Sequence, residues 1–234
     1  MENDLIDIYF ADLDSHPVPI TSAQIVLSED EVERSLRFKF EILGARFLTR
    51  RWLLRQLLSE RTDQPPAKLE FEYGEFGKPS LKGNSSVHFN LSHSSRWCAI
   101  AICEASEIGV DIEEIEDISE TELVSSRFFT DSEADRIRSA PDVQTGFFKC
   151  WTRKEAVIKA VGTGLSMPLD KFQVSLEESS PKLEWIGIDG EDAGDWSLHS
   201  TRPAERLITA VAVRAPGARF CDHGWLSIKE KIRS

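Results

Sequence analysis

The stretch Ile108-Gly-Val-Asp-Ile-Glu-Glu114 decides how the rest of the chain is interpreted. Val110 and Ile112 alternate with Asp111 and Glu113, so a strand here places the apolar pair on one face and both carboxylates on the other. Two like charges held side by side repel each other unless a cation or a proton lies between them. The pattern therefore predicts a site for a hard, oxygen-liganded cation such as Mg²⁺. The alternative is an edge strand with a solvated polar face.

The composition is that of a soluble globular protein with one large domain or two small ones. Its 234 residues are 41% hydrophobic and 29% charged. The acidic start MENDLIDIYF has no basic segment followed by an apolar run, and no apolar window is long enough to cross a bilayer. We therefore expect neither a secretory signal nor a membrane partner. The four cysteines lack metal-binding spacing and are expected to be reduced thiols in a cytoplasmic protein: Cys98, Cys103, Cys150 and Cys221.

The charge is strongly negative overall but unevenly distributed. A net charge of −12 argues against nucleic acid as a partner. Residues 34–61 contain eight basic and two acidic residues, whereas residues 104–133 contain eleven acidic residues and one basic residue. One concentrated basic segment in an acidic chain favours an anionic ligand bound at a single place. The alternative is that amphipathic helices simply differ in charge.

The hydrophobic patterning predicts an α+β fold of two similar halves, residues 1–108 and 109–234, with no linker between them. In the first half we expect helices at 28–40 and 42–60 and strands at 5–10, 69–73, 87–91 and 97–103, arranged as a three- or four-stranded antiparallel meander. In the second half we expect helices at 120–129, from 130 onward and at 144–161, and strands at 172–176, 183–188, 196–200 and 207–214.

A second informative stretch is Trp151-Thr-Arg-Lys-Glu-Ala-Val-Ile-Lys159 in the long helix. Glu155 and Lys159 are four residues apart and so share one helix face. The ordinary interpretation is a surface pair worth about 0.3–0.5 kcal/mol. The functional interpretation is that Glu155 joins Asp111 and Glu113 as a third oxygen ligand while Lys159 reaches a phosphate. Spacing alone leaves both open.

The third stretch is Phe89-Asn-Leu-Ser-His-Ser94, which leaves a strand and ends in hydroxyls and an imidazole. Ser92 and His93 at a strand end can donate hydrogen bonds to phosphate oxygens, although a loop histidine is more often a surface or packing residue. A nucleophilic serine–histidine pair is disfavoured, because neighbouring residues on a strand point to opposite faces.

Taken together, these stretches resemble the 4′-phosphopantetheinyl transferases of the surfactin-synthetase-activating type. FNLSHS, GVDIE and WTRKEAVIK occur in the family's order and at its separations. GEFGKP before the histidine motif, RFFTDSE before the long helix and GTGLSMPLD after it also match. The resemblance extends from about Arg46 to about Leu169.

The resemblance implies both a fold and an activity. The fold is a pseudo-twofold pair of α+β halves with coenzyme A in the cleft between them, and a monomer is expected. The activity is transfer of the 4′-phosphopantetheine arm of coenzyme A to a serine of an apo acyl or peptidyl carrier protein, which releases adenosine 3′,5′-bisphosphate. Two alternatives are a metal-dependent phosphohydrolase and a noncatalytic carrier-binding module.

The resemblance also implies the roles of individual residues. Asp111, Glu113 and Glu155 fall on the positions that bind Mg²⁺, or as second choice Mn²⁺, and the metal also holds the coenzyme A pyrophosphate. Lys159 falls on the lysine that stabilises the departing phosphate. The remaining coenzyme A contacts fall on Ser92 and His93 for phosphate, on Lys78 and Pro79 for the adenine nucleotide, and on Arg46 or Arg50 for the 3′-phosphate, with Arg50 favoured.

The resemblance gives two candidates for the general base and one region for the carrier surface. Glu133 falls on a candidate base, but it is also the fourth residue of Thr130-Asp-Ser-Glu, a capping-box pattern, and Glu155 is the alternative base. The family binds carriers beside residues 119–129. Phe128 and Phe129 lie there, yet we expect both to be core residues.

Overall fold

The computed structural model describes residues 5–83, 86–104 and 106–228. The first half contains β1 (Leu5–Asp12), α1 (Ile20–Val26), α2 (Glu29–Leu36), α3 (Glu41–Thr62), β2 (Phe71–Tyr73), β3 (Pro79–Leu81), β4 (His88–Ser94) and β5 (Trp97–Cys103). The second contains β6 (Ile108–Glu114), α4 (Thr121–Phe128), α5 (Asp131–Arg138), α6 (Val143–Val161), β7 (Phe172–Val174), β8 (Leu183–Ile186), β9 (Ser197–Thr201) and β10 (Leu207–Val213), followed by β11 (Arg219–Trp225).

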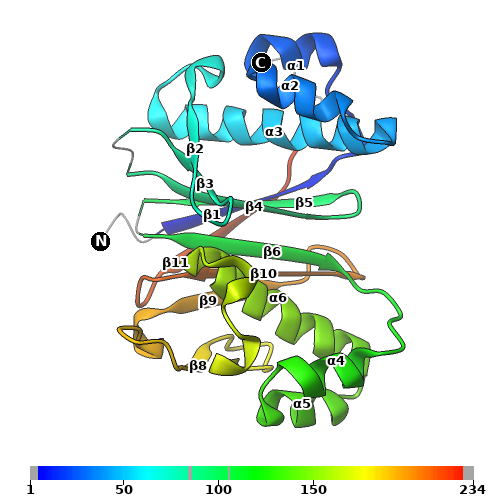
Figure 1. Cartoon of the computed structure of the whole chain (residues 1–234), viewed down its shortest axis with the longest axis vertical. Helices are drawn as coiled ribbons and strands as arrows, with labels where there is room; N and C mark the ends of the chain where they lie inside the picture. The colour runs from blue at the N-terminus through cyan, green and yellow to red at the C-terminus, as the bar shows by residue number, and fades with distance from the viewer. Residues whose placement is uncertain (1–4, 84–85, 105, 229–234) are drawn as a thin grey trace.

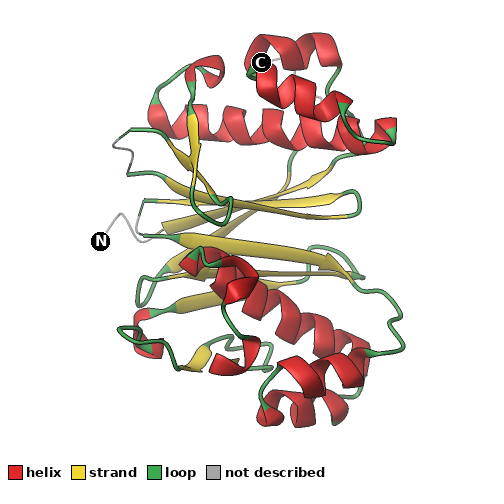
Figure 2. Cartoon of the chain, in the orientation of Figure 1, coloured by secondary structure: helices red, strands yellow, loops and turns green. Residues whose placement is uncertain are grey.

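The elements form four layers, in the order helices, sheet, sheet, helices (Figure 1). The first sheet has the strand order β11-β1-β5-β4, and the second has the order β6-β10-β9. Helix α3 lies over the outer face of the first sheet, with α1 and α2 packed against it, and α6 lies over the outer face of the second, with α4 and α5 packed against it (Figure 2). No helix in the described ranges is long and apolar enough to cross a membrane.

The inner faces of the two sheets bury a shared apolar core. Period-2 alternation supplies it, since every second residue of a strand points to the same face. The first sheet contributes Ile6, Ile8 and Phe10, and the second contributes Val110 and Ile112, all between 0% and 1% exposed. The apolar side chains of the IGVDIEE stretch therefore hold the two sheets together, and its acids face away from this core.

The α+β prediction is confirmed, but the predicted meander is wrong. Strand β1 pairs with β5 rather than with its neighbour in sequence, and β2 and β3 form a separate hairpin. Strand β11 was not predicted at all, and it pairs with β1 in parallel. Its sequence, RFCDHGW, has no fully buried residue, so it lacks the alternation that marks a half-buried strand.

Strand β4 is longer than the predicted strand 87–91 and runs to Ser94. A two-residue turn at 95–96, with Ser95 at φ 52°, connects it directly to β5, and Ser94 pairs with Trp97. Ser92 and His93 therefore lie inside a strand instead of beyond its end. They point to opposite faces of β4, which is an edge strand of the first sheet.

Gly109 lets β6 approach α6 more closely than any other residue type would. A Cβ atom built at Gly109 would lie 2.0 Å from the carbonyl oxygen of Ala156 and 2.4 Å from the amide nitrogen of Ala160. Asp111 shares its strand face with Gly109, and Lys159 lies in the same turn of α6 as Ala160. The close contact at Gly109 thus sets the distance between the acidic strand and the helix that carries Glu155 and Lys159.

Candidate active site

The acidic strand and the long helix meet at Asp111. Its Oδ1 accepts hydrogen bonds from the Ser92 hydroxyl at 2.9 Å and from the Lys159 ammonium at 2.6 Å. Lys159 Nζ also lies 2.9 Å from Ser92 Oγ, so the three groups form a closed triangle. Strands β4 and β6 and helix α6 each contribute one member. The structure thereby brings together residues from all three of the informative stretches in the sequence.

The inner face of β4 is polar where it borders β6. Asn90 Oδ1 accepts a hydrogen bond from the Val110 amide at 2.9 Å, and Ser94 Oγ accepts one from the Glu114 amide at 3.4 Å. Ser92 lies between these two positions and donates to Asp111. Because β6 is the edge strand of its sheet, these side chains satisfy backbone groups that would otherwise have no partner. Asn90 and Ser94 are site residues that the sequence argument missed, although their period-2 spacing with Ser92 was a usable signal.

All three predicted metal ligands are carboxyl groups that the site makes harder to ionise. Burial raises the pKa of Asp111, although Lys159 and Ser92 oppose the shift. Burial together with the negative charge of Asp111 raises the pKa of Glu113 to about 7. The pKa of Glu155 is also raised, by burial and then by Asp111, against the effect of Lys159. Such shifts are typical of carboxyl groups that are buried close to one another.

The orphaned oxygens of the site fit a bound cation. Asp111 Oδ2 and Glu155 Oε1 are buried, and neither has a hydrogen-bond partner among the described residues. Buried polar atoms without a partner are rare in folded proteins, and both are hard oxygen donors of the kind that Mg²⁺ prefers. The carboxylates of Asp111, Glu113 and Glu155 have not converged, however. In the described ranges, the one trio of metal-capable side chains with ligand atoms within 4.8 Å of one another lies elsewhere.

His93 and Arg50 lie on the other face of β4, toward α3. Burial, together with the positive charges of Arg50, Lys159 and Arg46, lowers the pKa of His93 to about 4, so the imidazole is neutral at neutral pH. The Arg50 guanidinium lies 5.0 Å from the centre of the Phe47 ring, and it has no carboxylate partner among the described residues. Burial lowers the pKa of Arg50 to about 10. The local field therefore favours an anion.

Arg46, by contrast, is already paired. Its Nε and its terminal nitrogen donate to the two carboxylate oxygens of Asp14 at 2.8 and 2.6 Å. Three other arginines of the same segment are also paired with acids, since Arg51 and Arg55 both bind Glu31 and Arg61 binds Asp7. The local excess of positive charge is thus smaller than the sequence suggests, and the free cation nearest to His93 is Arg50.

A small cavity of about 210 Å³ connects Lys159 with the predicted nucleotide turn. Lys78 and Pro79 line it from one side, and Lys159, Gly162 and Gly164 line it from the other. Lys78 Nζ donates to the carbonyl oxygen of Ala160 at 3.1 Å and forms an ion pair with Glu107 at 2.5 Å. The turn is therefore fastened to the end of α6.

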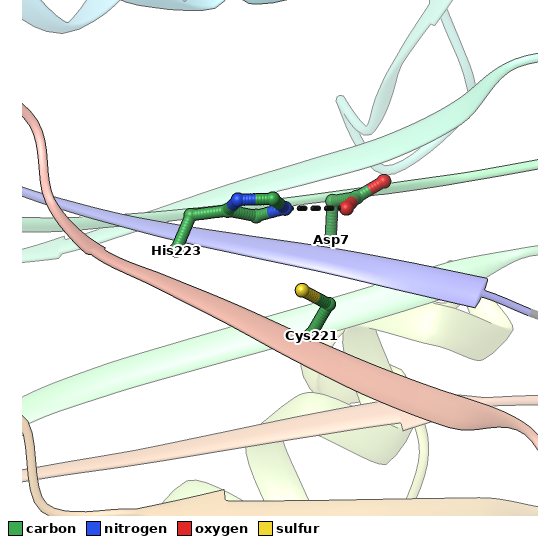
Figure 3. Close-up of side chains that lie close together, drawn as sticks. All are labelled: Asp7, Cys221 and His223. Carbon is green, nitrogen blue, oxygen red and sulfur yellow. Dashed lines mark hydrogen bonds and ion pairs between the residues drawn. The ribbon is translucent and has the colours of Figure 1, made fainter.

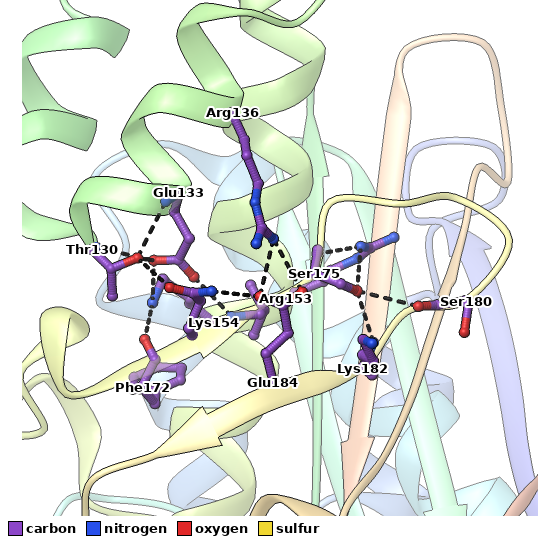
Figure 4. A network of polar contacts seen from close by, with 12 residues as sticks. Thr130, Glu133, Arg136, Arg153, Lys154, Phe172, Ser175, Ser180, Lys182 and Glu184 are labelled. Carbon is purple, nitrogen blue, oxygen red and sulfur yellow. Dashed lines mark hydrogen bonds and ion pairs between the residues drawn. The ribbon is translucent and has the colours of Figure 1, made fainter.

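Glu133 belongs to a buried polar network of the second half that includes Thr130 and Lys154 (Figure 4). It is 0% exposed and forms the capping box of α5 with Thr130. One oxygen lies 2.9 Å from Lys154 Nζ, and the other accepts a hydrogen bond from the Val174 amide at 2.8 Å. These contacts show that Glu133 forms the predicted capping box, while its role as the base stays a prediction.

Helix α4 presents more apolar surface than expected. Phe129 is 4% exposed and packs into the core, as predicted. The prediction for Phe128 is wrong, because this residue is 46% exposed, and Leu123, in the same helix, is 65% exposed. The helix has only eight residues, and Thr121 and Ser125 form its buried side. Its apolar residues therefore face outward.

Comparison with known proteins agrees with this geometry. A family model described as the 4′-phosphopantetheinyl transferase superfamily matches residues 107–212, and one described as 4′-phosphopantetheinyl transferase, N-terminal, matches residues 16–105. The chain is 33% identical to the 4′-phosphopantetheinyl transferase HetI of Nostoc sp., over 92% of this chain and 90% of that protein. It is 35% identical to a 4′-phosphopantetheinyl transferase of Bacillus subtilis, over 84% and 85%. With Sfp of Bacillus subtilis strain 168 it shares 35% identity over 65% and 67%.

The fold and the site together define the class of protein. It is an α+β enzyme built of two halves, with acidic residues and a lysine where the halves meet. The chain belongs to the 4′-phosphopantetheinyl transferase superfamily, and within it to the type that Sfp represents. This confirms the predicted activity, transfer of phosphopantetheine to carrier proteins, over the phosphohydrolase and binding-module alternatives.

Proposed function

We propose that this transferase moves the 4′-phosphopantetheine arm of coenzyme A to a serine hydroxyl of an apo acyl or peptidyl carrier protein and releases adenosine 3′,5′-bisphosphate. The observation that carries the site assignment is the triangle of Asp111, Ser92 and Lys159, bordered by unpartnered buried oxygens of Asp111 and Glu155. The pyrophosphate of coenzyme A is anionic, so it can approach these acids only across a cation.

The cation in this proposal is Mg²⁺, with Mn²⁺ as the second choice. Asp111, Glu113 and Glu155 would hold it, because all three offer oxygen ligands and all three have raised pKa values that a nearby positive charge relieves. When bound, the ion neutralises the pyrophosphate oxygens during displacement at phosphorus. Ser92 of β4 and Lys159 of α6 hold Asp111 in place.

The transfer step is assigned to residues of this chain in the following way. The carrier serine oxygen forms a bond to the phosphorus that bears the pantetheine, and the bond from that phosphorus to the oxygen of adenosine 3′,5′-bisphosphate breaks. In this proposal Glu155 also accepts the serine proton as the general base. Lys159 donates a hydrogen bond to the departing phosphate, and Ser92 holds Lys159 in position.

Coenzyme A recognition is assigned to both faces of β4. Arg50 and the neutral imidazole of His93 contact the 3′-phosphate region, supported by the absence of a carboxylate partner for Arg50 in the described part of the chain. Lys78 and Pro79 contact the adenine nucleotide across the cavity that they share with Lys159. We also propose that the chain divides at residue 108 into two halves with different tasks. Residues 1–108 supply these nucleotide contacts, and residues 109–234 supply the metal ligands.

The carrier is proposed to bind against α4. Leu123 and Phe128 are both exposed apolar residues of the helix that follows the acidic strand. An acidic carrier approaching an acidic enzyme needs such an apolar contact, because charge alone repels it. We further propose a monomer that acts in the cytoplasm, which agrees with four free cysteines.

The test is to incubate the purified chain with coenzyme A, Mg²⁺ and a panel of apo carrier proteins, and to measure the carrier masses. We expect the mass of the arm to appear on a carrier serine, and we expect Asp111→Ala and Glu155→Ala to abolish the transfer. Transfer that survives both substitutions would overturn the site assignment. Consumption of coenzyme A without a carrier would instead indicate hydrolysis.

A comparison of the two arginines tests the nucleotide contacts separately. Arg50→Ala should raise the KM for coenzyme A while the free energy of unfolding changes little. Arg46→Ala should mainly lower stability, because it breaks the bidentate pair with Asp14. If Arg46→Ala alone raises that KM, the 3′-phosphate contact belongs to Arg46.

A further inference from the structure

A second group of metal-capable side chains lies at the opposite side of the first sheet from β4. Asp7, Cys221 and His223 each offer one ligand atom, and these atoms all lie within 4.8 Å of one another (Figure 3). Asp7 belongs to β1, and the other two belong to β11. None of the three takes part in the proposed transfer reaction.

Strand pairing explains why residues 216 positions apart come together. Strands β1 and β11 are parallel neighbours, and Asp7 is directly opposite Cys221. His223 lies two residues further along β11, on the same face as Cys221. The register shifts between Ile8 and Phe10, where His223 and Gly224 together lie opposite Tyr9, and Gly224 has φ 70°, so His223 is part of a bulge. Its imidazole contacts both Tyr9 and Asp7.

The surroundings hold the ligand atoms in place. The His223 ring stacks on Tyr9 with their centres 4.6 Å apart, and its Nε2 lies 2.5 Å from Asp7 Oδ1. Arg61 donates to the other carboxylate oxygen of Asp7, also at 2.5 Å, which orients the carboxylate from behind. Asp7 is 4% exposed, whereas Cys221 and His223 are partly open to solvent, so an ion can enter from the surface.

The donor set identifies the class of ion. One sulfur, one imidazole nitrogen and one carboxylate oxygen form the mixed set that Zn²⁺ and similar late first-row ions bind, whereas Mg²⁺ prefers oxygen donors alone. Three protein ligands leave the fourth tetrahedral position to water. We propose that Asp7, Cys221 and His223 bind Zn²⁺ and thereby join strand β11 to strand β1.

Binding follows ordinary thiol chemistry. The Sγ–H bond of Cys221 breaks, its proton goes to solvent, and the thiolate binds the ion. The ion replaces the direct contact between His223 and Asp7. Strand β11 is an edge strand of the first sheet, and β1 is its neighbour. The bound ion would therefore stabilise the attachment of β11 to the sheet without contacting Asp111 or Lys159.

The experiment uses the full chain without a polyhistidine tag. The chain is stripped with a chelator and kept in excess Mg²⁺, and Zn²⁺ is then titrated against a chromophoric chelator. We expect one Zn²⁺ per chain and a rise in the unfolding temperature on binding. Cys221→Ser and His223→Gln should each weaken Zn²⁺ binding at least about tenfold. With Co²⁺ as the probe, the thiolate-to-metal absorption band should disappear in Cys221→Ser.

Two kinds of control separate this site from others. Cys150→Ala and His16→Gln, which lie outside the cluster, should bind Zn²⁺ as the unchanged chain does. The titration is repeated in an Asp111→Ala background, so that zinc held at the transferase site is not counted. Failure of the unchanged chain to bind Zn²⁺ in excess Mg²⁺ would overturn the proposal. Undiminished binding by either Cys221→Ser or His223→Gln would do so as well.

Discussion

Lys159 Nζ on α6 and Asp111 Oδ1 on β6 lie 2.6 Å apart and form the ion pair on which the site is built. The carboxylate is almost fully buried, and the ammonium group is partly open to the cavity. Without a bound cation, Lys159 is the main positive charge that offsets the burial of Asp111. It can therefore turn toward a phosphate once another positive charge reaches the acid.

The first prediction concerns Lys159 itself. Lys159→Met should lower kcat by about 10²–10³-fold, the usual cost of losing one preorganised donor to developing charge. The KM for the carrier should change little, because the side chain faces the cavity and not α4. Carrier modification measured over time by mass spectrometry gives both constants. Lys171→Met, at an exposed lysine, should leave both constants unchanged.

The second prediction separates the two candidate bases. Glu133→Gln removes the charge from a fully buried pair with Lys154, so the free energy of unfolding should fall by about 3–5 kcal/mol. The folded molecules should still transfer the arm at the normal rate. Glu155→Gln should do the opposite, with little change in stability and a large loss of kcat.

Urea unfolding and activity per folded molecule measure these two effects separately. The double variant Glu133→Gln/Lys154→Met should recover part of the lost stability, because it no longer leaves an unpaired buried ammonium. A large fall in kcat for folded Glu133→Gln would return Glu133 to the role of base.

The third prediction is a pH dependence due to His93. The folded-state pKa is about 4, below the ordinary value of 6.5, so between these values the unfolded chain binds more protons than the folded chain. The stability that His93 contributes is thus present above pH 6.5 and is lost as the pH falls toward 4. In urea unfolding at pH 7 and pH 5, His93→Asn should lose less stability than the unchanged chain.

The comparison for that experiment is His16→Asn, an exposed histidine, which should lose as much stability as the unchanged chain. Adenosine 3′,5′-bisphosphate should raise the pKa of His93 in NMR titrations, because a phosphate placed nearby favours the charged imidazole. A pKa that does not respond to this ligand would place the phosphate elsewhere.

The fourth prediction concerns the packing at Gly109. Gly109→Ala places a methyl group within 2.0–2.4 Å of the α6 backbone, so α6 has to move away from β6. We expect a loss of at least about 1–3 kcal/mol in stability together with reduced kcat, since the distance between Lys159 and Asp111 changes too. Gly74→Ala is the matched control, because its nearest neighbour would be 3.8 Å away. Equal effects of the two substitutions would show that Gly109 has no special role.

The acidic strand and the long helix were predictable because their patterns are local. Alternation defined β6, and helical spacing placed Glu155 and Lys159 on one face. Their convergence was not readable from spacing, because it depends on the contact between Gly109 and Ala156 across the sheet–helix interface. Only the resemblance to a family linked the stretches before the fold was known.

Other features were ambiguous in the sequence for physical reasons. The Thr130-to-Glu133 segment reads as a capping box whether or not Glu133 is a base, and only its burial against Lys154 separates the roles. Arg46 and Arg50 are equivalent by spacing, and the distinction comes from Asp14, more than thirty residues away. Strand β11 is stabilised by pairing with β1, and its sequence does not alternate between buried and exposed residues. The local sequence therefore did not predict it.

Strand β11 also fixes the order in which the molecule can be completed during synthesis. The ribosome makes β1 early and β11 late. Strand β11 therefore cannot pair with β1 until the segment that forms the second sheet has been synthesised. During that interval β1 exposes unpaired backbone groups, the condition under which edge strands pair with other chains. The second sheet takes all its strands from residues 108–213 and needs no such wait. The first half can therefore be completed only after the second half has been synthesised.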